Sequence, residues 1–396
     1  IMANNNENKV LNVPNLRFPE FTEEWERCSL GHVTDFVKER ISTDKLTLAN
    51  YVSTENMKSD FGGINPAISI PNNTNVIHYK KGDVLLSNIR PYLRKVWAAN
   101  SDGGCSTDVF VFRAKSISPS FLHYIMANDT FINYVMSGAK GVKMPRGDKE
   151  QMLKYVFSIP RIEEQYKISR LLHLLDDRIA TQNKIIEDLK KLKSAISKHL
   201  FVRKDLLETT ICLSNIATLK NGYAFQSGKY NALGKWKILT ITNVSGERYI
   251  NDEDYNCIIN LPNDIQDHQV LKEGDILISL TGNVGRVSLC KDGDYLLNQR
   301  VGLLQLAKNV NQEFLYQILS SQRFENSMIA CGQGAAQMNI GKGDVESYVL
   351  PYSSNVNNIL LVAKILHSYD EYIINEQRKL TLLTMQKQYF LAQMFI

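Results

Sequence analysis

The sequence predicts an α+β protein in which two pseudo-repeated globular domains are separated by a pair of long antiparallel coiled-coil helices. Three observations lead to this fold. Similar segments recur in the same order, each repeat opens with short β-type runs, and each repeat closes with a long stretch that lacks Pro and Gly. We expect the two globular domains at 1–160 and 205–351, and the two helices at 161–204 and 352–396.

The repeat is visible in three pairs of segments that lie about 190 residues apart and keep the same order. They are KKGDVLLS (80–87) with KEGDILIS (272–279), SFLHYIM (120–126) with EFLYQIL (313–319), and VFSIP (156–160) with SYVLP (347–351). Self-similarity of this kind indicates that one structural unit is present twice.

Each repeat begins with runs that are typical of β-strands. DVLLSNI, DVFVFRA, DILISLT and VGLLQLA are rich in branched or aromatic apolar residues and lie between segments containing Gly, Asn or Pro. Such runs bounded by turn residues predict short strands.

Each repeat ends in a helix whose apolar positions alternate by four and three residues. Eight of the ten seam positions are apolar in each helix, and the polar exceptions fall at the same two places, Gln182 and Lys193 in the first and Glu376 and Lys387 in the second. The pattern predicts coiled-coil pairing. The apolar seam residues are Ile168, Leu172, Leu175, Ile179, Ile186, Leu189, Ile196 and Leu200, matched by Val362, Leu366, Tyr369, Ile373, Leu380, Leu383, Phe390 and Met394.

The helices could also pack separately, each on its own domain, and the seam alone allows parallel or antiparallel pairing. Antiparallel pairing within the chain would place one globular unit at each end of a rod. A seam of this length spans about 50 Å, more than one compact domain needs, so the pair is typical of a spacer. Lys193 and Lys387 could each fix the register. The other faces carry charged residues, among them Asp176 and Asp177.

Composition sets limits on the class of protein. The chain has 46 Lys and Arg against 41 Asp and Glu, a net charge of +5, which neither requires nor excludes a basic nucleic-acid-binding face. No apolar run is long enough to span a membrane, and the Asn-rich start lacks the apolar stretch of a signal peptide. The six scattered cysteines favour a reducing compartment. We therefore expect a cytoplasmic protein.

Sequence motifs for catalysis or metal binding are absent. The chain contains no P-loop, no G-x-G-x-x-G, no H-E-x-x-H, no G-x-S-x-G and no Asn/Asp-Pro-Pro-aromatic motif of adenine aminomethyltransferases. Its seven histidines lack metal-ligand spacing. Asp83 and Asp275 each follow a glycine and are interpreted as turn residues before a strand. We predict no catalytic residues and no metal ligands.

Two basic segments in the first domain are candidates for nucleic-acid contact. Residues 80–95 hold five basic side chains and one acid, with aromatic and amide residues interleaved, and residues 137–149 hold four basic side chains and one acid. Basic groups contact phosphates, and Arg or Asn can also contact base edges. The candidates are Asn88, Arg90, Tyr92, Arg94, Lys95, Lys140, Lys143 and Arg146.

The matching segments of the second domain are less basic and richer in amides. Arg can grip guanine bidentately, and Asn or Gln can do the same with adenine. Different side chains at matching places would suit two domains that read different sequences. The candidates are Asn283, Arg286, Gln299, Arg300, Gln333, Gln337, Asn339 and Lys342.

Together these features resemble the specificity (S) subunit of type I restriction–modification systems. The resemblance extends from about Phe18 to Phe395 and rests on EEWERCSLGHV, GYAFQSGKY, GDILISLTGNVGRV, NQRVGLLQL and GAAQMNIGKGDVESYVLP. It rests also on the helical region that begins IPRIEEQYKISRLLHLLDD. In the second unit, PYSSNVNN departs from the P-x-x-E-E-Q start of the first helix. We add Tyr223 and Gln226, in GYAFQSGKY, to the DNA-binding candidates.

The resemblance implies two target-recognition domains that each read one half of a bipartite DNA site, with the helices setting the spacer. It implies that the helices dock two adenine methyltransferase subunits, and that motor–nuclease subunits join through the methyltransferases. The chain itself would bind no cofactor, whereas S-adenosylmethionine, ATP and Mg²⁺ are expected on partner subunits. The alternative hypothesis is a non-catalytic coiled-coil scaffold whose end domains bind proteins.

Overall fold

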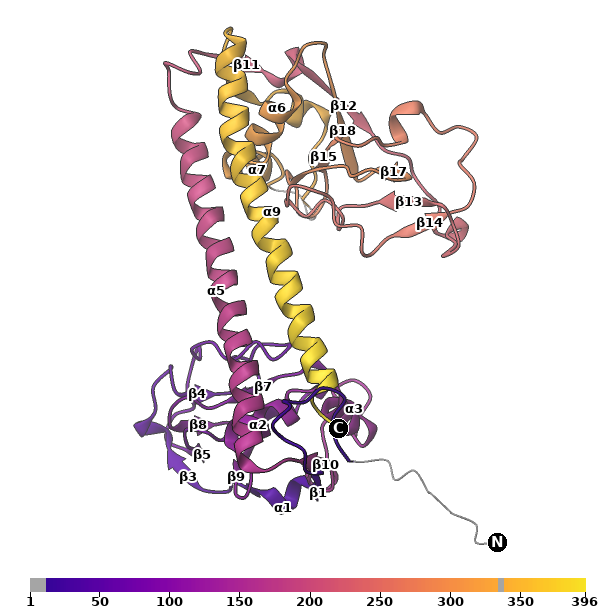
Figure 1. Cartoon of the computed structure of the whole chain (residues 1–396). Helices are drawn as coiled ribbons and strands as arrows, with labels where there is room; N and C mark the ends of the chain where they lie inside the picture. Colours follow the sequence, from indigo (N-terminus) through magenta and orange to yellow (C-terminus); the bar gives the residue numbers. More distant parts are fainter. Residues whose placement is uncertain (1–11, 334–337) are drawn as a thin grey trace, which may run out of the picture. The chain divides into compact units, whose positions relative to one another are not determined.

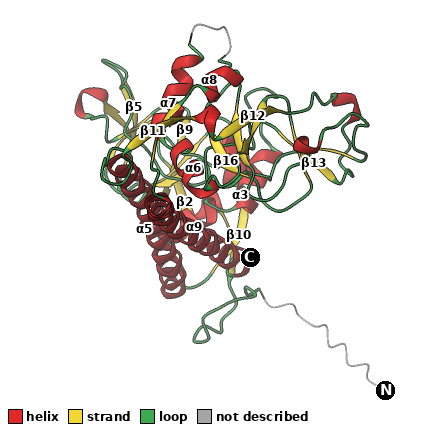
Figure 2. Cartoon of the chain, turned by 90° about the horizontal axis from the view of Figure 1, so that it is seen from above, coloured by secondary structure: helices red, strands yellow, loops and turns green. Residues whose placement is uncertain are grey.

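The computed structural model describes residues 12–333 and 338–396 (Figure 1). The chain divides into two compact units. The first contains the chain up to Thr181 together with Leu380–Ile396, and the second contains Gln182–Lys379. Each unit combines short strands and short helices with one part of each long helix. Figure 2 shows the helices, strands and loops of the chain.

The elements follow one another in a similar order in both units. Before the first long helix the structure has β1 (Glu26–Ser29), α1 (Leu30–Val33), β2 (Thr34–Phe36), β3 (Arg40–Ser42), β4 (Tyr51–Val52), β5 (Asn75–Tyr79), β6 (Val84–Ser87), β7 (Val96–Ala98), β8 (Gly103–Cys105), β9 (Val109–Ala114), α2 (Pro119–Met126), α3 (Asp129–Ser137), α4 (Lys149–Leu153) and β10 (Val156–Ile159). Between the long helices lie β11 (Thr209–Cys212), β12 (Ala217–Asn221), β13 (Trp236–Leu239), β14 (Asn256–Ile258), β15 (Ile276–Ser279), β16 (Val287–Leu289), β17 (Tyr295–Leu297), β18 (Val301–Leu306), α6 (Gln312–Leu319), α7 (Gln322–Cys331), α8 (Lys342–Glu346) and β19 (Val349–Tyr352). Short 3-10 turns occupy Thr43–Lys45, Pro91–Leu93, Leu213–Asn215, Ser227–Lys229 and Asp267–Gln269.

Both units are built on the same antiparallel four-stranded sheet. Its strand order is β2-β9-β6-β7 in the first unit and β12-β18-β15-β16 in the second. A two-stranded ladder, β1-β10 or β11-β19, accompanies each sheet, and a further sheet is β3-β5-β8-β4 in the first unit and β14-β13-β17 in the second. The four strand-forming runs predicted from the sequence correspond to β6, β9, β15 and β18.

One inner strand of each sheet, β6 or β15, is buried on both faces, which explains why its first three residues are all apolar instead of alternating. In β6, Val84 and Leu86 pack into a core shared with α2 and α3, whereas Leu85 points into a second core with Tyr79 and Val111. The second unit divides its apolar side chains around β15 in the same way. Each unit is therefore layered, with helices on one face of the sheet and further strands on the other.

The long helices are α5 (Ile162–Leu200) and α9 (Val356–Gln393), and they pack antiparallel, as predicted (Figure 1, magenta and yellow). Every seam position named above is buried or half-buried, while most other positions of α5 are exposed. The helix ends also join the domain cores: Leu172 and Met394 belong to the core of the first unit, and Leu200 and Leu366 to that of the second. Pairing with the other helix and packing on the globular domain therefore occur together.

The start of α9 differs from the start of α5, at the place where the sequence departs from the repeat. In α5, Glu164 accepts two hydrogen bonds from Arg17. Before α9, the Glu208 carboxylate instead accepts hydrogen bonds from the backbone N–H and the hydroxyl of Ser354. Hydrogen bonding from the Ser353 side chain, followed by that from Ser354, lowers the pKa of Glu208 to about 2. Different side chains thus hold the two helix starts.

The polar seam positions meet acids on the opposite helix. Lys193 donates to Asp370 over 2.5 Å in the second unit, and Lys387 donates to Asp176 over 2.5 Å in the first. The two pairs are related by the sequence repeat, because both residues of one pair lie 194 positions from those of the other. Asp176, which the sequence placed on a charged outer face, instead borders the seam and also accepts from the Tyr124 hydroxyl.

The ion pair between Lys193 and Asp370 is part of a buried charge network in the second unit. Arg248 donates to both carboxylate oxygens of Glu313 at 2.9 and 2.6 Å and to Asp370 at 3.0 Å. Gln317 donates to the same two acids. Burial lowers the pKa of Arg248, but the interactions with Glu313, Tyr249 and Asp370 together outweigh it, and the pKa is raised overall. The network joins α5, α6, α9 and the segment that carries Arg248.

Removing Asp370 should leave two cations close together without their shared carboxylate. Asp370→Ala is expected to lower the free energy of unfolding by about 3–5 kcal/mol, as for a broken buried ion pair. Asp188→Ala, which removes an exposed acid from α5, should change it by less than about 0.5 kcal/mol. Urea denaturation of both variants measures the difference. Equal losses would show that the network does not stabilise the protein.

Candidate nucleic-acid interface

The structure joins the two basic segments that the sequence identified in the first unit. Ile89 and Arg146 form an antiparallel bridge, and the Arg90 N–H donates to the Pro145 carbonyl over 2.8 Å. The Gly147 N–H donates to the Asn88 carbonyl over 3.2 Å. Residues that are far apart in the sequence therefore form one surface, here called the first loop pair (88–95 and 137–149).

The cations of the first loop pair differ in their surroundings. Arg90 and Lys143 are exposed, and neither side chain has an ion-pair or hydrogen-bond partner among the described residues. Lys140 contacts Asp148 at 2.8 Å, and Arg146 contacts Asp108 at 3.2 Å, both as exposed cations. Within the described structure, Arg90 and Lys143 are thus exposed cations of this surface with no carboxylate partner.

Three other candidates of the first unit have contacts within the domain. Arg94 binds the carboxylates of Asp60 and Asp129, and the Lys95 ammonium donates to the Thr54 carbonyl over 2.6 Å. Asn88 is buried, and its side-chain oxygen lacks a hydrogen-bond partner within the described part of the chain. Tyr92, by contrast, is 49% exposed. Among these, Tyr92 is the side chain that is open to a ligand.

The second unit joins its matching segments in the same way, forming a second loop pair (280–286 and 338–342). Thr281 and Asn339 form an antiparallel bridge at the places that correspond to Ile89 and Arg146. The Leu280 N–H donates to the Arg300 carbonyl, and the Gln299 N–H donates to the Tyr223 carbonyl, each over 3.0 Å. Four segments with predicted DNA-binding residues are therefore adjacent.

Most polar candidates of the second unit are exposed without side-chain partners among the described residues. They are Gln226, Asn283, Gln299, Arg300, Gln333 and Asn339. Three others are engaged: Tyr223 donates to Asp264 over 2.8 Å, Arg286 lies 3.5 Å from Glu325, and Lys342 lies 3.7 Å from Glu346. Gln337 falls outside the described residues.

Sequence reasoning missed two residues of the first loop pair and one residue that contacts it. Val142 is fully exposed and Met144 is 50% exposed, so two apolar side chains project from a basic loop, where contact with a thymine methyl group is possible. Asp108 accepts from the Asn88 N–H and pairs with Arg146. The apolar residues within SGAKGVKMPRGDK could have been recognised in the sequence, whereas the position of Asp108 beside this loop depends on the fold.

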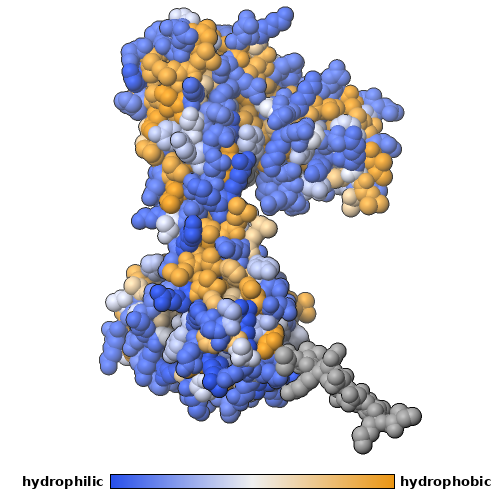
Figure 3. All heavy atoms as spheres, viewed as in Figure 1, coloured by the Kyte–Doolittle hydropathy of each residue, from blue (hydrophilic) through white to orange (hydrophobic). Residues whose placement is uncertain are grey.

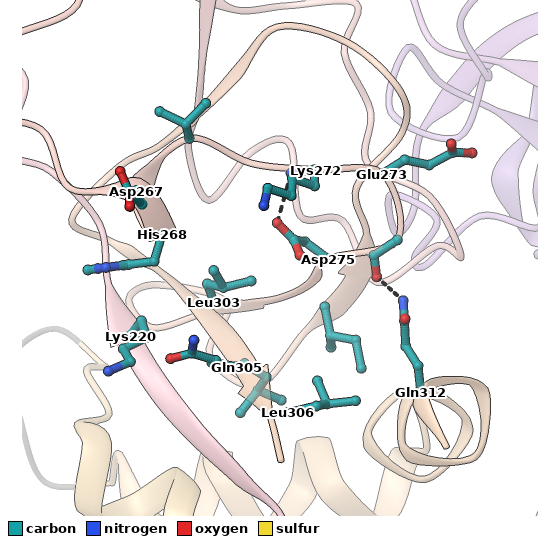
Figure 4. A pocket seen from close by; sticks show the side chains of 14 residues that line it. Lys220, Asp267, His268, Lys272, Glu273, Asp275, Leu303, Gln305, Leu306 and Gln312 are labelled. Carbon is teal, nitrogen blue, oxygen red and sulfur yellow. Dashed lines mark hydrogen bonds between the residues drawn. The ribbon is translucent and has the colours of Figure 1, made fainter. Parts of the chain in front are cut away.

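The two Gly-Asp positions are turn residues. The Asp83 carboxylate accepts from the Lys80 N–H, and the Asp275 carboxylate accepts from the Lys272 N–H, each over 2.8 Å. Asp275 lines a hollow of about 560 Å³ in the second unit, together with Lys220, His268 and Gln312 (Figure 4). Burial raises the pKa of Asp275. Each carboxylate is held by its own turn, which agrees with the interpretation from sequence.

The described residues, 12–333 and 338–396, lack two kinds of feature. None of their helices is both long and apolar enough to cross a membrane. No group of three or more His, Cys, Asp or Glu side chains among them is arranged to hold a metal ion.

Comparison with protein families identifies both repeats. The model described as "Type I restriction modification DNA specificity domain" matches residues 22–191 and again 208–385. The chain belongs to this family. It is a non-catalytic DNA specificity subunit of a type I restriction–modification system, with two target-recognition domains.

Two curated relatives are specificity subunits. The chain is 25% identical over 354 residues to the type I restriction enzyme MjaVIII specificity subunit of Methanocaldococcus jannaschii, covering 79% of this chain and 78% of the relative. It is 31% identical over 94 residues to the EcoDI specificity subunit of Escherichia coli, covering 24% and 21% of the two chains.

Solved structures show the same fold. The type I restriction–modification S subunit of M. genitalium aligns with a TM-score of 0.61 at 15% identity, covering 97% of this chain and 99% of that one. A chain from a study of complex assembly and conformational transition in the type I system aligns with a TM-score of 0.55 at 18% identity, covering 93% and 96%. Type I specificity subunits act within complexes with other subunits.

The free guanidinium of Arg90 provides a test of the first loop pair. Arg90→Ala should weaken DNA binding and make the plot of log K against log salt shallower by about 0.9, the contribution of one phosphate contact. Filter binding or fluorescence anisotropy between 50 and 200 mM salt measures both values. Lys115→Ala, which removes an exposed cation from the end of β9, is the control. An unchanged slope in Arg90→Ala would place the DNA-binding face elsewhere.

Proposed function

We propose that each target-recognition domain of this specificity subunit reads one half of a bipartite DNA site through its loop pair. The helix pair α5–α9 sets the unread spacer between the half-sites. The subunit thereby directs adenine methylation and DNA cleavage that partner subunits carry out.

The observation that carries this proposal is that one backbone arrangement presents different side chains in the two units. The bridges Ile89–Arg146 and Thr281–Asn339 hold equivalent loops. The first loop pair offers free cations and exposed apolar side chains, whereas the described candidates of the second unit are mostly Asn and Gln, with Arg300 as a free cation among them. Amide side chains favour adenine and guanidinium groups favour guanine. Two domains with a shared scaffold and different loops suit a site with two dissimilar halves.

We further propose that two methyltransferase subunits dock on the helix pair, one beside each domain. Exposed apolar side chains on α9 support this proposal, among them Leu361 and Tyr372 in the second unit and Leu382 and Met385 in the first. Apolar atoms also gather over the long helices on the face shown in Figure 3. Such surface on a water-facing helix is typical of a protein–protein interface.

Each unit has a groove beside the long helices and the neighbouring short helices, and in the second unit α9 also lines it at Asp370 and Ile373. The second-unit groove, of about 840 Å³, is lined by the end of α5 and the two residues that follow it, at Lys190, Lys193, Ser194, Ser197, Lys198, Phe201 and Val202. The first-unit groove, of about 610 Å³, is lined by the end of α9 and residues that follow it, at Thr384, Lys387, Gln388, Leu391, Ala392, Phe395 and Ile396. These are the same seven positions of the repeat. Two equivalent grooves suit two copies of one partner.

Motor–nuclease subunits would then join through the methyltransferases. S-adenosylmethionine, ATP and Mg²⁺ would bind those partners. A subunit that acts on chromosomal or invading DNA with these partners would work in the cytoplasm.

The spacer proposal is tested by lengthening both helices by one heptad, which preserves the seam register. Seven residues add about 10 Å, so the spacer should grow by about three base pairs with both half-sites unchanged. The chain is purified with its methyltransferase partner, and methylated adenines are mapped by modification-sensitive sequencing.

Exchange of residues 18–155 for those of a relative is the matched experiment, and it should change one half-site and leave the spacer intact. Methylation at the same sites without the specificity subunit would contradict the function. An unchanged spacer in the lengthened variant would contradict the role of the helices alone.

The grooves are tested by filling them. Ser194→Trp and Gln388→Trp occupy matched, exposed positions of the two grooves, so each should reduce the bound methyltransferase from two copies to one. The double variant should bind none. Lys191→Trp, exposed on α5 outside the groove, is the control. Native mass spectrometry counts the copies, and two copies bound to both single variants would place docking elsewhere.

A further inference from the structure

One junction of the first unit concentrates strained backbone. Asp60, Phe61, Arg90 and Arg94 all adopt left-handed conformations, with φ of 55°, 59°, 51° and 54°. The Asp60 N–H donates to the Leu93 carbonyl over 3.0 Å, and the Phe61 N–H donates to the Arg94 carbonyl over 2.8 Å. Non-glycine residues hold this conformation only where the surrounding contacts impose it. The junction therefore defines the shape of the 88–95 loop.

The Arg94 side chain ties this junction together. Its guanidinium donates to Asp60 at 2.8 Å and to Asp129 at 2.9 Å, and it lies over the Phe61 ring with 5.7 Å to the centroid. The hydrogen bonds to the two carboxylates raise the pKa of Arg94. Because Asp129 is the first residue of α3, Arg94 connects the loop both to the 60–61 turn and to a helix of the domain core.

At the position that corresponds to Arg94, the second unit has a glycine, Gly285. The Ser87 N–H donates to the Lys95 carbonyl, and the Ser279 N–H donates to the Arg286 carbonyl, so Arg94 and Gly285 precede equivalent residues. Gly285 has φ of +79°, which glycine adopts without penalty. The first unit holds an arginine in a conformation that favours glycine, which indicates that the arginine side chain has a task.

Arg94 and Arg90 differ in their electrostatic surroundings. Two carboxylates within hydrogen-bond distance give the surroundings of Arg94 a net negative charge, which repels a phosphate. Arg90, at the other end of the same 3-10 turn, has no carboxylate partner in the described structure. An approaching DNA backbone would therefore meet Arg90 and not Arg94.

We propose that Arg94 is a positioning residue for specificity. Through Asp60 and Asp129 it holds the loop in the shape that presents Tyr92 to the base edges of the first half-site, and it does not itself contact DNA. This inference rests on the proposed reading of that half-site by the first loop pair. It assigns to Arg94 a role different from the direct contact predicted by the sequence.

The test compares Arg94→Ala, Arg94→Gly and Arg90→Ala in the complex with the methyltransferase partner, on cognate and unrelated duplexes across salt concentrations. Arg94→Ala should weaken cognate binding by about tenfold, the effect of losing one good base contact, and leave unrelated DNA and the salt slope unchanged. Arg94→Gly relieves the backbone strain but removes the hydrogen bonds to Asp60 and Asp129. It should therefore lose less cognate affinity than Arg94→Ala. Arg90→Ala should weaken both duplexes and reduce the slope by about 0.9.

Other results would overturn the inference. Equal weakening on both duplexes with a reduced slope in Arg94→Ala would make Arg94 a phosphate contact, and unchanged cognate binding would remove its role. Thermal melting and methyltransferase stoichiometry control for folding and assembly. If Arg94→Ala lowers the melting temperature, Asp129→Asn repeats the comparison with Arg94 and Asp60 intact, and the same criteria apply. A wild-type complex that does not prefer cognate DNA would instead contradict the proposed function.

Discussion

The structure depends on lysine–carboxylate pairs placed inside an otherwise apolar helix seam. Lys193 with Asp370 and Lys387 with Asp176 occur at repeat-related positions of α5 and α9. An apolar seam alone tolerates sliding by one heptad, because every layer offers similar surface. A charge pair satisfied in a single alignment makes other registers costly, since each would bury a charge without its partner.

The same pairs connect the seam to the globular parts. Asp370 also accepts hydrogen bonds from Arg248 and Gln317, and Asp176 accepts one from the Tyr124 hydroxyl. The carboxylate that sets the helix register is thus bound by residues of the neighbouring domain within the same unit. Because a domain is attached through several charged and hydrogen-bonded contacts, its loops are held on a rigid base, which binding sites require if their side chains are to be preorganised.

Much of the fold could be predicted from the sequence, because burial leaves periodic traces. The alternation by four and three gave the seam, and the recurrence of KKGDVLLS as KEGDILIS gave the repeated sheet. The partners of the seam lysines could not be predicted, since Asp176 and Asp370 lie beside the apolar register and look like surface charges. The candidate interface could likewise be predicted only in part. Basic loops are visible in a sequence, but whether Arg94 is free depends on Asp60 and Asp129, which the fold brings from separate segments.

The first unit combines residues from both ends of the chain, which affects how the protein folds during synthesis. Its core includes Met394, which is 2% exposed, and Phe395, which stacks on Phe121 at 5.2 Å. A ribosome delivers Phe121 long before those residues, whereas everything needed for the second unit has emerged by Lys379. The domain made first is therefore completed last. Until then, the apolar surface around Phe121 lacks its cover, and this is the interval in which a nascent chain is most exposed to aggregation or to chaperones.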